Sequence, residues 1–331
     1  MAEGTEGGVV ETDLLIPGAG PTGLYATYYA GFRELDVTVV DSLPEPGGQI
    51  AALYPEKQIF DVAGFPAVRG QTLVDNLVAQ ASQADPTYLL GHRAEELVEL
   101  GDEGLEVTTH RGTRIRAGAM IITGGIGTFT PRPLPGGEAY VGRGVRYFVR
   151  ELASLADADV LIVGGGDSAF DWAANLEPIA RSITLIHRRD RFRAHERTVK
   201  QVMASSVDVQ VFTEVTEIRG DGHVEEVEVA NSKTGERGVL QVSEIVAALG
   251  FTADLGPLKR WGLELDKRKI VVDTRMATNR GRVFAAGDIT SYPGKVDLIS
   301  VGFGEAAIAV NNAVVALDPN ARLFPGHSSD P

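Results

Sequence analysis

The pattern of apolar and polar residues along the chain shows one arrangement twice. In the first copy, an apolar run at residues 10–16 precedes a helical stretch at 24–32 and a second apolar run at 37–41. In the second copy, a run at 160–163 precedes a helical stretch that reaches about residue 180 and a run at 183–189. Continuous apolar runs are typical of parallel strands buried on both faces, and the helical period between them predicts a crossover helix. Each copy therefore predicts a strand–helix–strand unit.

A glycine-rich turn joins strand to helix in each copy. The first glycine of such a turn permits a sharp bend, the second lets the backbone approach a pyrophosphate, and the third small residue lets the helix pack on the strand. The N–H groups at the start of the helix then bind the phosphates. Two such turns predict two dinucleotide sites. The residues expected to line them are Gly18, Gly20, Thr22 and Gly23 in the first turn, and Gly164, Gly166, Asp167, Ser168 and Ala169 in the second.

The residues that follow each second strand distinguish the two nucleotides. Asp41 ends the first unit, where a carboxylate accepts hydrogen bonds from ribose hydroxyls and repels a 2′-phosphate. Arg188 and Arg189 stand at the equivalent place in the second unit, with Arg191 and Arg193 close behind. Paired guanidinium groups suit a 2′-phosphate dianion. The first site is therefore expected to take FAD or NAD and the second NADPH, although a solvated basic face would also explain the arginines.

Composition narrows the possible chemistry. The chain has 331 residues, of which 44% are hydrophobic, enough for two domains. It contains no cysteine, which excludes disulfides, thiolate metal sites and a redox-active dithiol. A net charge of −14 argues against nucleic acid or an anionic membrane as the main partner. We expect no metal site, no signal peptide and no apolar run of membrane-spanning length, and hence a cytoplasmic protein.

Further motifs resemble the thioredoxin-reductase-like flavoproteins and, among them, the ferredoxin (or flavodoxin)–NADP⁺ reductases. The resemblance extends over nearly the whole chain, and residues 53–57, 192–196 and 326–329 carry its most specific parts. It implies an α/β fold with two Rossmann-like, three-layer dinucleotide-binding domains. Residues 1–129 and 252–331 would form an FAD-binding domain with a C-terminal flavin-covering tail, split by an NADPH-binding domain at 130–251.

The resemblance also implies roles for single residues. Tyr54 would stack on one face of the flavin and His327, in the tail, would cover the other; a core tyrosine and an unbound tail histidine are the alternatives. The other residues implied around FAD are Asp41, Gly48, Gln49, Ala94, Phe129, Gly287, Asp288 and Ser329. Those implied around NADP, besides the second turn, are His187, Arg188, Arg189 and Arg193.

The absence of cysteine favours the ferredoxin (or flavodoxin) reductase branch of the group. Thioredoxin reductases carry a Cys-x-x-Cys motif before the second glycine turn, whereas residues 144–151 here contain no thiol. Electrons would therefore leave the flavin directly for a small acidic carrier, ferredoxin or flavodoxin, and the resemblance implies a homodimer. Two alternatives stay open: another cysteine-free NADPH-dependent flavin reductase or monooxygenase with a different acceptor, and a protein that binds FAD or NADP(H) without catalysis.

Two local features add expectations. Pro17 ends the first strand and removes a backbone donor from a central position, which we expect to shift the turn and weaken FAD binding. A basic cluster in this acidic chain is either a solvated surface or a docking patch for the carrier. The cluster consists of Lys259, Arg260, Lys267, Arg268 and Lys269.

Overall fold

The chain folds as two compact units. The computed structural model describes residues 8–324 and 326, with the backbone alone at 128, 129 and 253. Unit 1 comprises Met1–Thr128 and Ala253–Pro331, and unit 2 comprises Phe129–Thr252. The chain passes from one unit to the other through β9 (Thr128–Pro131) and β18 (Phe251–Asp254), which pair with each other. The prediction of an α/β fold with two Rossmann-like dinucleotide-binding domains is confirmed.

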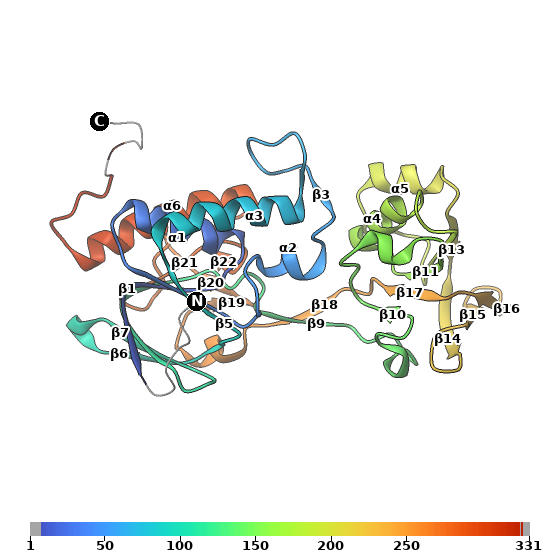
Figure 1. Cartoon of the computed structure of the whole chain (residues 1–331), viewed down its shortest axis with the longest axis horizontal. Helices are drawn as coiled ribbons and strands as arrows, with labels where there is room; N and C mark the ends of the chain where they lie inside the picture. Colours follow the sequence, from blue (N-terminus) through green and yellow to red (C-terminus); the bar gives the residue numbers. More distant parts are fainter. Residues whose placement is uncertain (1–7, 325, 327–331) are drawn as a thin grey trace. The chain divides into compact units, whose positions relative to one another are not determined.

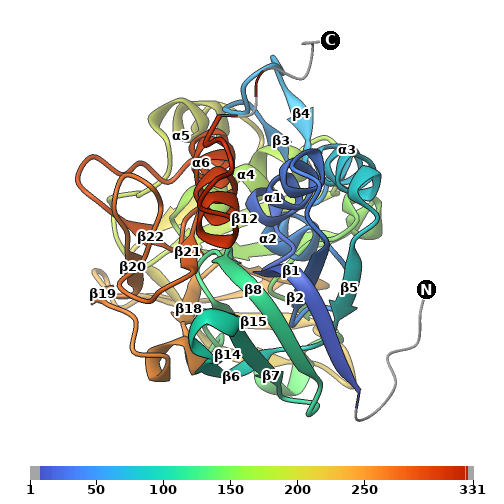
Figure 2. The same ribbon diagram turned by 90° about the vertical axis from the view of Figure 1, so that its left-hand side faces the viewer.

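The central sheet of unit 1 has the strand order β5-β2-β1-β8-β7-β6, and β21 pairs with the end of β8. Its parallel part is formed by β5, β2, β1, β8 and β21, whereas β7 and β6 continue it antiparallel. The strands are β1 (Val9–Pro17), β2 (Val37–Asp41), β5 (Thr87–Leu90), β6 (Ala94–Glu99), β7 (Leu105–Thr109), β8 (Arg114–Ile122) and β21 (Val283–Ala285). The helices of unit 1 are α1 (Pro21–Phe32), α2 (Gly48–Leu53), α3 (Gly70–Ala81) and α6 (Ile299–Leu317). Figures 1 and 2 show α1, α3 and α6 on the same side of this sheet.

Smaller elements complete unit 1. A hairpin joins β3 to β4, and a three-stranded sheet has the order β19-β20-β22. Their bounds are β3 (Gln58–Ile59), β4 (Val68–Arg69), β19 (Leu265–Asp266), β20 (Lys269–Val271) and β22 (Thr290–Ser291). Short 3-10 helices are η1 (Ser82–Ala84), η2 (Gly101–Glu103) and η5 (Gly256–Arg260) here, and η3 (Glu138–Tyr140) and η4 (Leu152–Leu155) in unit 2.

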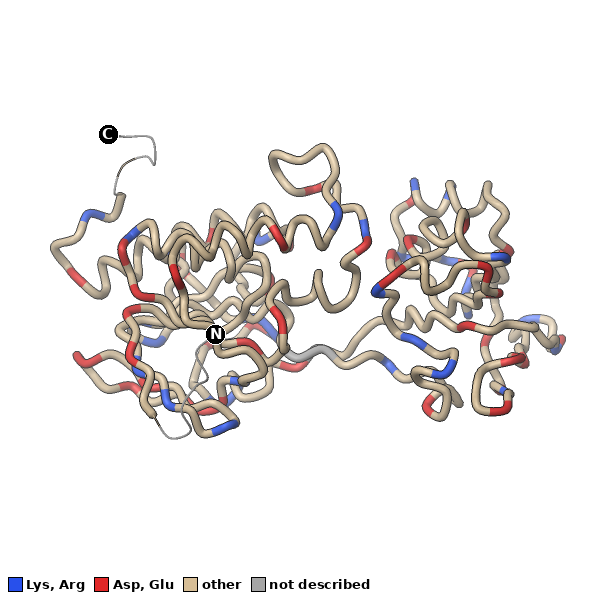
Figure 3. The backbone as a smooth tube through the Cα atoms, viewed as in Figure 1, with Lys and Arg blue, Asp and Glu red and all other residues tan. Residues whose placement is uncertain are grey.

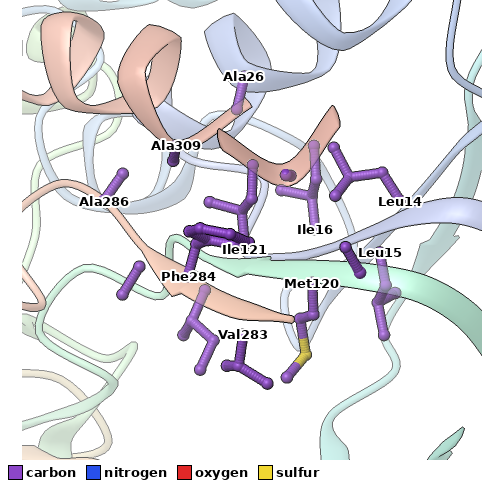
Figure 4. Close-up of a cluster of buried hydrophobic side chains, with 14 of the residues drawn as sticks. Leu14, Leu15, Ile16, Ala26, Met120, Ile121, Val283, Phe284, Ala286 and Ala309 are labelled. Carbon is purple, nitrogen blue, oxygen red and sulfur yellow. The ribbon is translucent and has the colours of Figure 1, made fainter. Parts of the chain in front are cut away.

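The core of unit 1 lies on both faces of the sheet, and one part of it fills the space between the sheet and the helical layer (Figure 4). Leu14 and Ile16 of β1 and Ile121 of β8 are fully buried, as expected for strands with neighbours on both sides. Ala26 of α1 and Ala309 of α6 are also fully buried and appear near these side chains in Figure 4. Small residues at these positions let the helices approach the sheet closely, which places the start of α1 at the ends of the strands.

Helix α6 is long and apolar enough, by length and composition, to cross a membrane. Glu305, Asn311 and Asn312 interrupt its sequence, so it is not the uninterrupted apolar run that the sequence was expected to lack. Ala306, Val310 and Ala313 on this helix are fully buried in the core cluster of unit 1. Its buried Glu305 pairs with Lys295 inside the same unit. These contacts are those of a core helix.

Unit 2 contains a five-stranded parallel sheet and a three-stranded antiparallel sheet, with strand orders β10-β17-β11-β12-β13 and β14-β15-β16. The parallel strands are β10 (Val145–Arg146), β11 (Asp159–Val163), β12 (Ser182–His187), β13 (Asp208–Val211) and β17 (Glu244–Ala247). The antiparallel strands are β14 (Thr213–Arg219), β15 (Glu226–Asn231) and β16 (Arg237–Gln241), and the helices are α4 (Asp167–Leu176) and α5 (Glu196–Met203).

Pro17 fits the sheet despite its missing donor. It pairs in register with Val40 of β2, and its carbonyl accepts a hydrogen bond from Thr123 N at 2.8 Å. The next residue, Gly18, donates its N–H to Val40 O at 2.8 Å. The strand is thus held on both sides up to the turn, and Pro17 ends β1 without displacing it.

Candidate functional site

The first glycine turn is packed tightly from behind. Gly18 has φ +120°, and a Cβ atom built there would lie 2.5 Å from Thr123 O. A Cβ atom at Gly23 would lie 1.8 Å from Gly18 O. At Gly20, which precedes α1, the nearest atom to a built Cβ is Gly48 Cα at 4.0 Å. The side of the turn that faces the sheet, at Gly18 and Gly23, therefore has no room for a side chain. At Gly20 the space next to the backbone is open.

The loop before α2 lies against this turn. Gly47 donates its N–H to Ala19 O at 2.8 Å, and a Cβ atom at Gly48 would lie 2.9 Å from Gly20 Cα. The Gln49 amide lies nearby, since its Nε2 is 3.1 Å from a Cβ atom built at Gly125. The start of α1 has no side-chain cap, so its first N–H groups remain available to an anion. The residues of this region fit the pyrophosphate of a dinucleotide.

Asp41 is held at the end of β2 by backbone hydrogen bonds. Its Oδ2 accepts from Ala19 N at 2.6 Å and its Oδ1 accepts from Leu43 N at 2.8 Å. Burial raises the pKa of this carboxyl, and the hydrogen bonds from Leu43 and Ala19 oppose that shift. Each carboxylate oxygen has a second lone pair, so the group can still accept from ribose hydroxyls.

Tyr54, Gly287 and Asp288 come together in the same unit. Tyr54 ends α2, and burial together with the negative charges of Asp288 and Asp61 raises its pKa to about 12. The Asp288 carboxyl has a raised pKa, mainly because of burial and then because of the charge of Asp297. Gly287 has φ +85°, and a Cβ atom there would lie 2.9 Å from Thr22 Oγ1. The charge of Asp288, the residue expected beside the ribityl chain, therefore acts on Tyr54, the residue expected to stack on the flavin.

For the other residues implied around FAD, the structure gives only the position of the backbone or of a neighbouring residue, or does not describe them. Ala94 begins β6 two residues after His92, whose N–H donates to Asp41 O at 2.8 Å. Phe129 lies in β9, where the structure describes the backbone alone. His327 and Ser329 lie outside the described residues, so the predicted flavin-covering tail stays a prediction.

Sequence reasoning missed three residues that support this region. Thr123 donates its hydroxyl to Gly18 O at 2.8 Å. Glu305 accepts from Gly287 N at 2.7 Å, and Lys295 forms an ion pair with Glu305. Glu305 could have been found as the single charged residue in the sequence of α6.

The second glycine turn repeats the packing of the first. A Cβ atom at Gly164 would lie 2.4 Å from Ala248 O and 3.1 Å from the Cβ of Ala169, which is fully buried. At Gly166, before α4, a Cβ atom would meet nothing within 4 Å. The start of α4 has no side-chain cap, and Ser168 in its first turn is exposed. This turn likewise suits a phosphate group.

The loop that follows β12 folds back onto this turn. Arg193 donates its N–H to Gly165 O at 2.8 Å, and His195 donates its N–H to an Asp167 carboxylate oxygen at 2.8 Å. The Asp167 side chain thus holds the loop, and its predicted contact with NADP stays a prediction. The structure brings the arginines to this turn as exposed side chains: Arg188, Arg189, Arg191 and Arg193.

His187 lies beneath the same turn. A Cβ atom at Gly165 would lie 2.4 Å from its ring, and the ring centroid of Phe192 is 5.7 Å away. Burial lowers the pKa of His187; a hydrogen bond with the Arg191 backbone opposes this, and the nearby arginine charges add to the lowering. The imidazole is therefore neutral at neutral pH and supports the turn by packing.

The basic cluster of unit 1 is largely neutralised by its own carboxylates. Three of its cations form ion pairs: Lys259 with Asp254 at 2.5 Å, Arg260 with Glu95 at 3.1 Å and Lys269 with Asp297 at 2.6 Å. More generally, acidic and basic residues are interspersed along the chain (Figure 3). Among residues 8–324 and 326, no group of His, Cys, Asp and Glu is arranged to hold a metal ion.

Comparisons with known proteins agree with this geometry. Residues 12–313 match the model of the family described as pyridine nucleotide-disulphide oxidoreductase. A ferredoxin–NADP reductase of Frankia casuarinae is 61% identical over 96% of this chain and 98% of its own. One from Halalkalibacterium halodurans is 48% identical over 96% of this chain and 97% of its own.

Solved thioredoxin reductases share the architecture. The enzyme of T. acidophilum superposes with a TM-score of 0.78 at 25% identity, covering 93% of this chain and 98% of its own. The enzyme of Lactococcus lactis gives a TM-score of 0.77 at 25% identity, covering 92% of this chain and 99% of its own.

Proposed function

Since this chain belongs to the pyridine nucleotide-disulphide oxidoreductase family and, within it, to the ferredoxin–NADP reductases, we propose that it exchanges electrons between NADP(H) and ferredoxin through FAD. The observation that carries the proposal is the presence of two packed glycine turns whose neighbouring side chains carry opposite charges. The first is followed by the half-buried carboxylate of Asp41, and the second by the exposed guanidinium groups of Arg188 and Arg189. With no cysteine in the chain, no dithiol takes part.

FAD, when bound, accepts a hydride and returns electrons singly to a one-electron carrier. We assign its pyrophosphate to the N–H groups at the start of α1 and its adenosine ribose to Asp41. Tyr54 has a pKa of about 12 and therefore remains a neutral aromatic ring beside the flavin at working pH. Asp288 lies on the ribityl side, next to Gly287.

NADP(H) is assigned to unit 2. The N–H groups at the start of α4 would bind its pyrophosphate, and Arg188 and Arg189 its 2′-phosphate. The hydrogen bond from Arg193 N to Gly165 O keeps the arginine-bearing loop next to the turn. This arrangement supports a preference for NADPH over NADH.

The carrier that exchanges electrons is proposed to be ferredoxin or flavodoxin. Lys259, Arg260 and Lys269 are already paired, whereas the exposed Lys267 forms no ion pair within the described part of the chain, so we test the docking role of the cluster at Lys267. Lys267→Glu should then raise the KM for ferredoxin and leave NADPH oxidation by ferricyanide unchanged. An unchanged KM would reject this patch while leaving the reductase activity standing.

We propose a homodimer that works in the cytoplasm. Helices α1 and α6 pack together and contain one charged residue between them, the buried Glu305. Phe32 of α1 and Ile308 of α6 are 38% and 41% exposed, so this face offers apolar surface to a second copy. Sedimentation of wild type and Ile308→Glu tests the dimer, with a monomeric variant expected, and cell fractionation tests the location.

The proposed activity is tested by titrating the purified protein anaerobically with NADPH and then with NADH, following flavin absorbance. Bleaching at much lower NADPH than NADH concentration supports both nucleotide assignments. A protein without a flavin band, or with a band that NADPH does not bleach, would instead be a binding protein without this activity. A stable oxygen adduct of the flavin would point to a monooxygenase.

A further inference from the structure

Unit 1 buries an ion pair beside the expected FAD site. The side chains of Lys295 and Glu305 are 6% and 3% exposed, and Lys295 Nζ lies 2.5 Å from Glu305 Oε1. Desolvating two charges is costly, and an apolar pair of similar volume often stabilises a protein more. Stability alone therefore does not explain a carboxylate in the middle of an otherwise uncharged helix.

Glu305 uses both oxygens to join three parts of the unit. Oε1 also accepts from the Tyr292 hydroxyl at 2.6 Å, while Oε2 accepts from Gly287 N at 2.7 Å. Burial, the hydrogen bond to Glu305 and its negative charge raise the pKa of Tyr292 to about 12, so Tyr292 stays a donor. One carboxylate thus connects α6, the loop after β22 and the turn at Gly287.

The Gly287 turn packs closely against Thr22 at the start of α1. Thr22 Oγ1 lies 2.9 Å from a Cβ atom built at Gly287 and 2.4 Å from one built at Gly302 of α6. Gly287 Cα is 3.4 Å from that same Gly302 position. A shift of the Gly287 turn toward α1 would therefore press on the Thr22 side chain, which lies in the first helical turn expected to bind the pyrophosphate.

Lys295 also acts on Asp288. Burial and the charge of Asp297 raise the pKa of the Asp288 carboxyl, whereas the charges of Lys295 and then Lys269 lower it. Lys269 already pairs with Asp297 in a more exposed position, with side chains 33% and 51% exposed. The two lysines therefore offer a natural comparison between a buried and an exposed counter-charge near the same carboxylate.

We propose that Lys295 and Glu305 are positioning residues for FAD, a role that rests on the proposed FAD site of unit 1. Glu305 holds the Gly287 amide and thereby the spacing between Asp288 and the start of α1. Lys295 holds the Glu305 side chain in place through the buried ion pair. Neither residue needs to touch the reacting atoms.

The experiment measures the rate at which FAD leaves the holoenzyme on dilution, from the rise in flavin fluorescence. Lys295→Met should release FAD about 10-fold faster or more, because Glu305 loses its counter-charge. Lys295→Arg should stay within about threefold of wild type, and Lys295→Met/Glu305→Gln should recover most of the loss because the two residues act as a pair. The matched control, Lys269→Met, should change the rate less than about twofold.

NADP⁺ affinity serves as the folding control, because it reports on unit 2 and should remain unchanged in every variant. The proposal is overturned if Lys295→Met lowers the melting temperature but releases FAD at the wild-type rate, or if Lys269→Met has an equal effect. If Lys295→Met fails to fold, Lys295→Arg and Glu305→Gln decide in the same way, with Glu305→Gln expected to release FAD faster. A wild-type protein without FAD would reject the proposed function itself, before any variant is compared.

Discussion

The turns at residues 18–23 and 164–169 share a backbone plan and differ in their electrostatic surroundings. In both, the first glycine is packed against a neighbouring strand end, by Thr123 O in unit 1 and by Ala248 O in unit 2. Around the first, the chain places the half-buried carboxylates of Asp41 and Asp288. Around the second, it places exposed arginines.

The two turns show that pyrophosphate binding and nucleotide selectivity depend on different residues. Packed glycines and uncapped helix starts provide for a pyrophosphate of any dinucleotide. The charges beyond the second strand select which nucleotide binds. Substitutions of the packed glycines, Gly18 and Gly164, should therefore affect folding and with it binding, whereas substitutions of the charged residues should affect selectivity.

The largest effect is expected where a glycine has no space behind it. Gly18→Ala would place a Cβ atom 2.5 Å from Thr123 O at φ +120°, so that backbone must move. We expect a loss of about 3 kcal/mol in the free energy of unfolding, together with loss of bound FAD. Urea unfolding and the flavin absorbance of the purified protein measure both.

Gly166→Ala, at the unpacked glycine before α4 in the other turn, is the contrasting variant. Its φ is −103° and nothing lies within 4 Å of a built Cβ atom, so stability should change by less than about 0.5 kcal/mol. FAD content should stay at the wild-type level, whereas NADPH binding should weaken because the methyl group occupies phosphate space. Equal destabilisation by the two variants would show that the turns are not packed as described.

The next effect concerns selectivity. Replacing Arg188 and Arg189 by alanine removes charge-assisted hydrogen bonds to the 2′-phosphate, each about 10-fold in affinity. The KM for NADPH should rise about 100-fold, and the KM for NADH should stay within about twofold. Steady-state reduction of ferricyanide gives both constants. A parallel rise for NADH would mean that the arginines do not read the 2′-phosphate.

The sequence was informative where a feature is local and uninformative where distant segments meet. The two glycine turns and the strands around them follow from apolar runs and spacing, and the structure has β1, α1 and β2 as expected. The contact of Thr22 with Gly287 and Gly302 joins residues from both ends of the chain. No periodicity in the sequence predicts this contact or the buried pairing of Glu305 with Lys295.

Asp167 shows the same limit at closer range. Its position in the turn suggested a nucleotide contact, whereas its carboxylate accepts the His195 N–H in the structure. Asp167→Ala should therefore loosen the loop that carries Arg193 and raise the KM for NADPH about 10-fold. Asp167→Asn keeps an acceptor oxygen and should stay within about twofold. If alanine instead lowers the KM, the carboxylate acts mainly by repelling the phosphates.

The smallest effect concerns the protonation of Tyr54 and His187. Folding raises the pKa of Tyr54 in unit 1 and lowers that of His187 in unit 2, so each group stays neutral over a wider pH range in the folded chain. The pKa of Tyr54 is about 12 in the folded chain and 10.0 as its ordinary value, so the unfolded chain releases this proton first. The stability that depends on Tyr54 is thus complete below pH 10 and is lost as the pH rises toward 12. Near pH 11, wild type should have lost about 1 kcal/mol more than Tyr54→Phe, relative to their values at pH 8.

His187 works in the other direction, because its pKa is lowered on folding. Its contribution is complete above its ordinary pKa of 6.5 and is lost as the pH falls through the lowered value. Urea unfolding of wild type and Tyr54→Phe at pH 8 and pH 11 therefore isolates unit 1, since His187 is neutral at both. Identical losses in the two proteins would mean that Tyr54 ionises as easily in the folded chain as in the unfolded one, and that its ring is not enclosed beside Asp288.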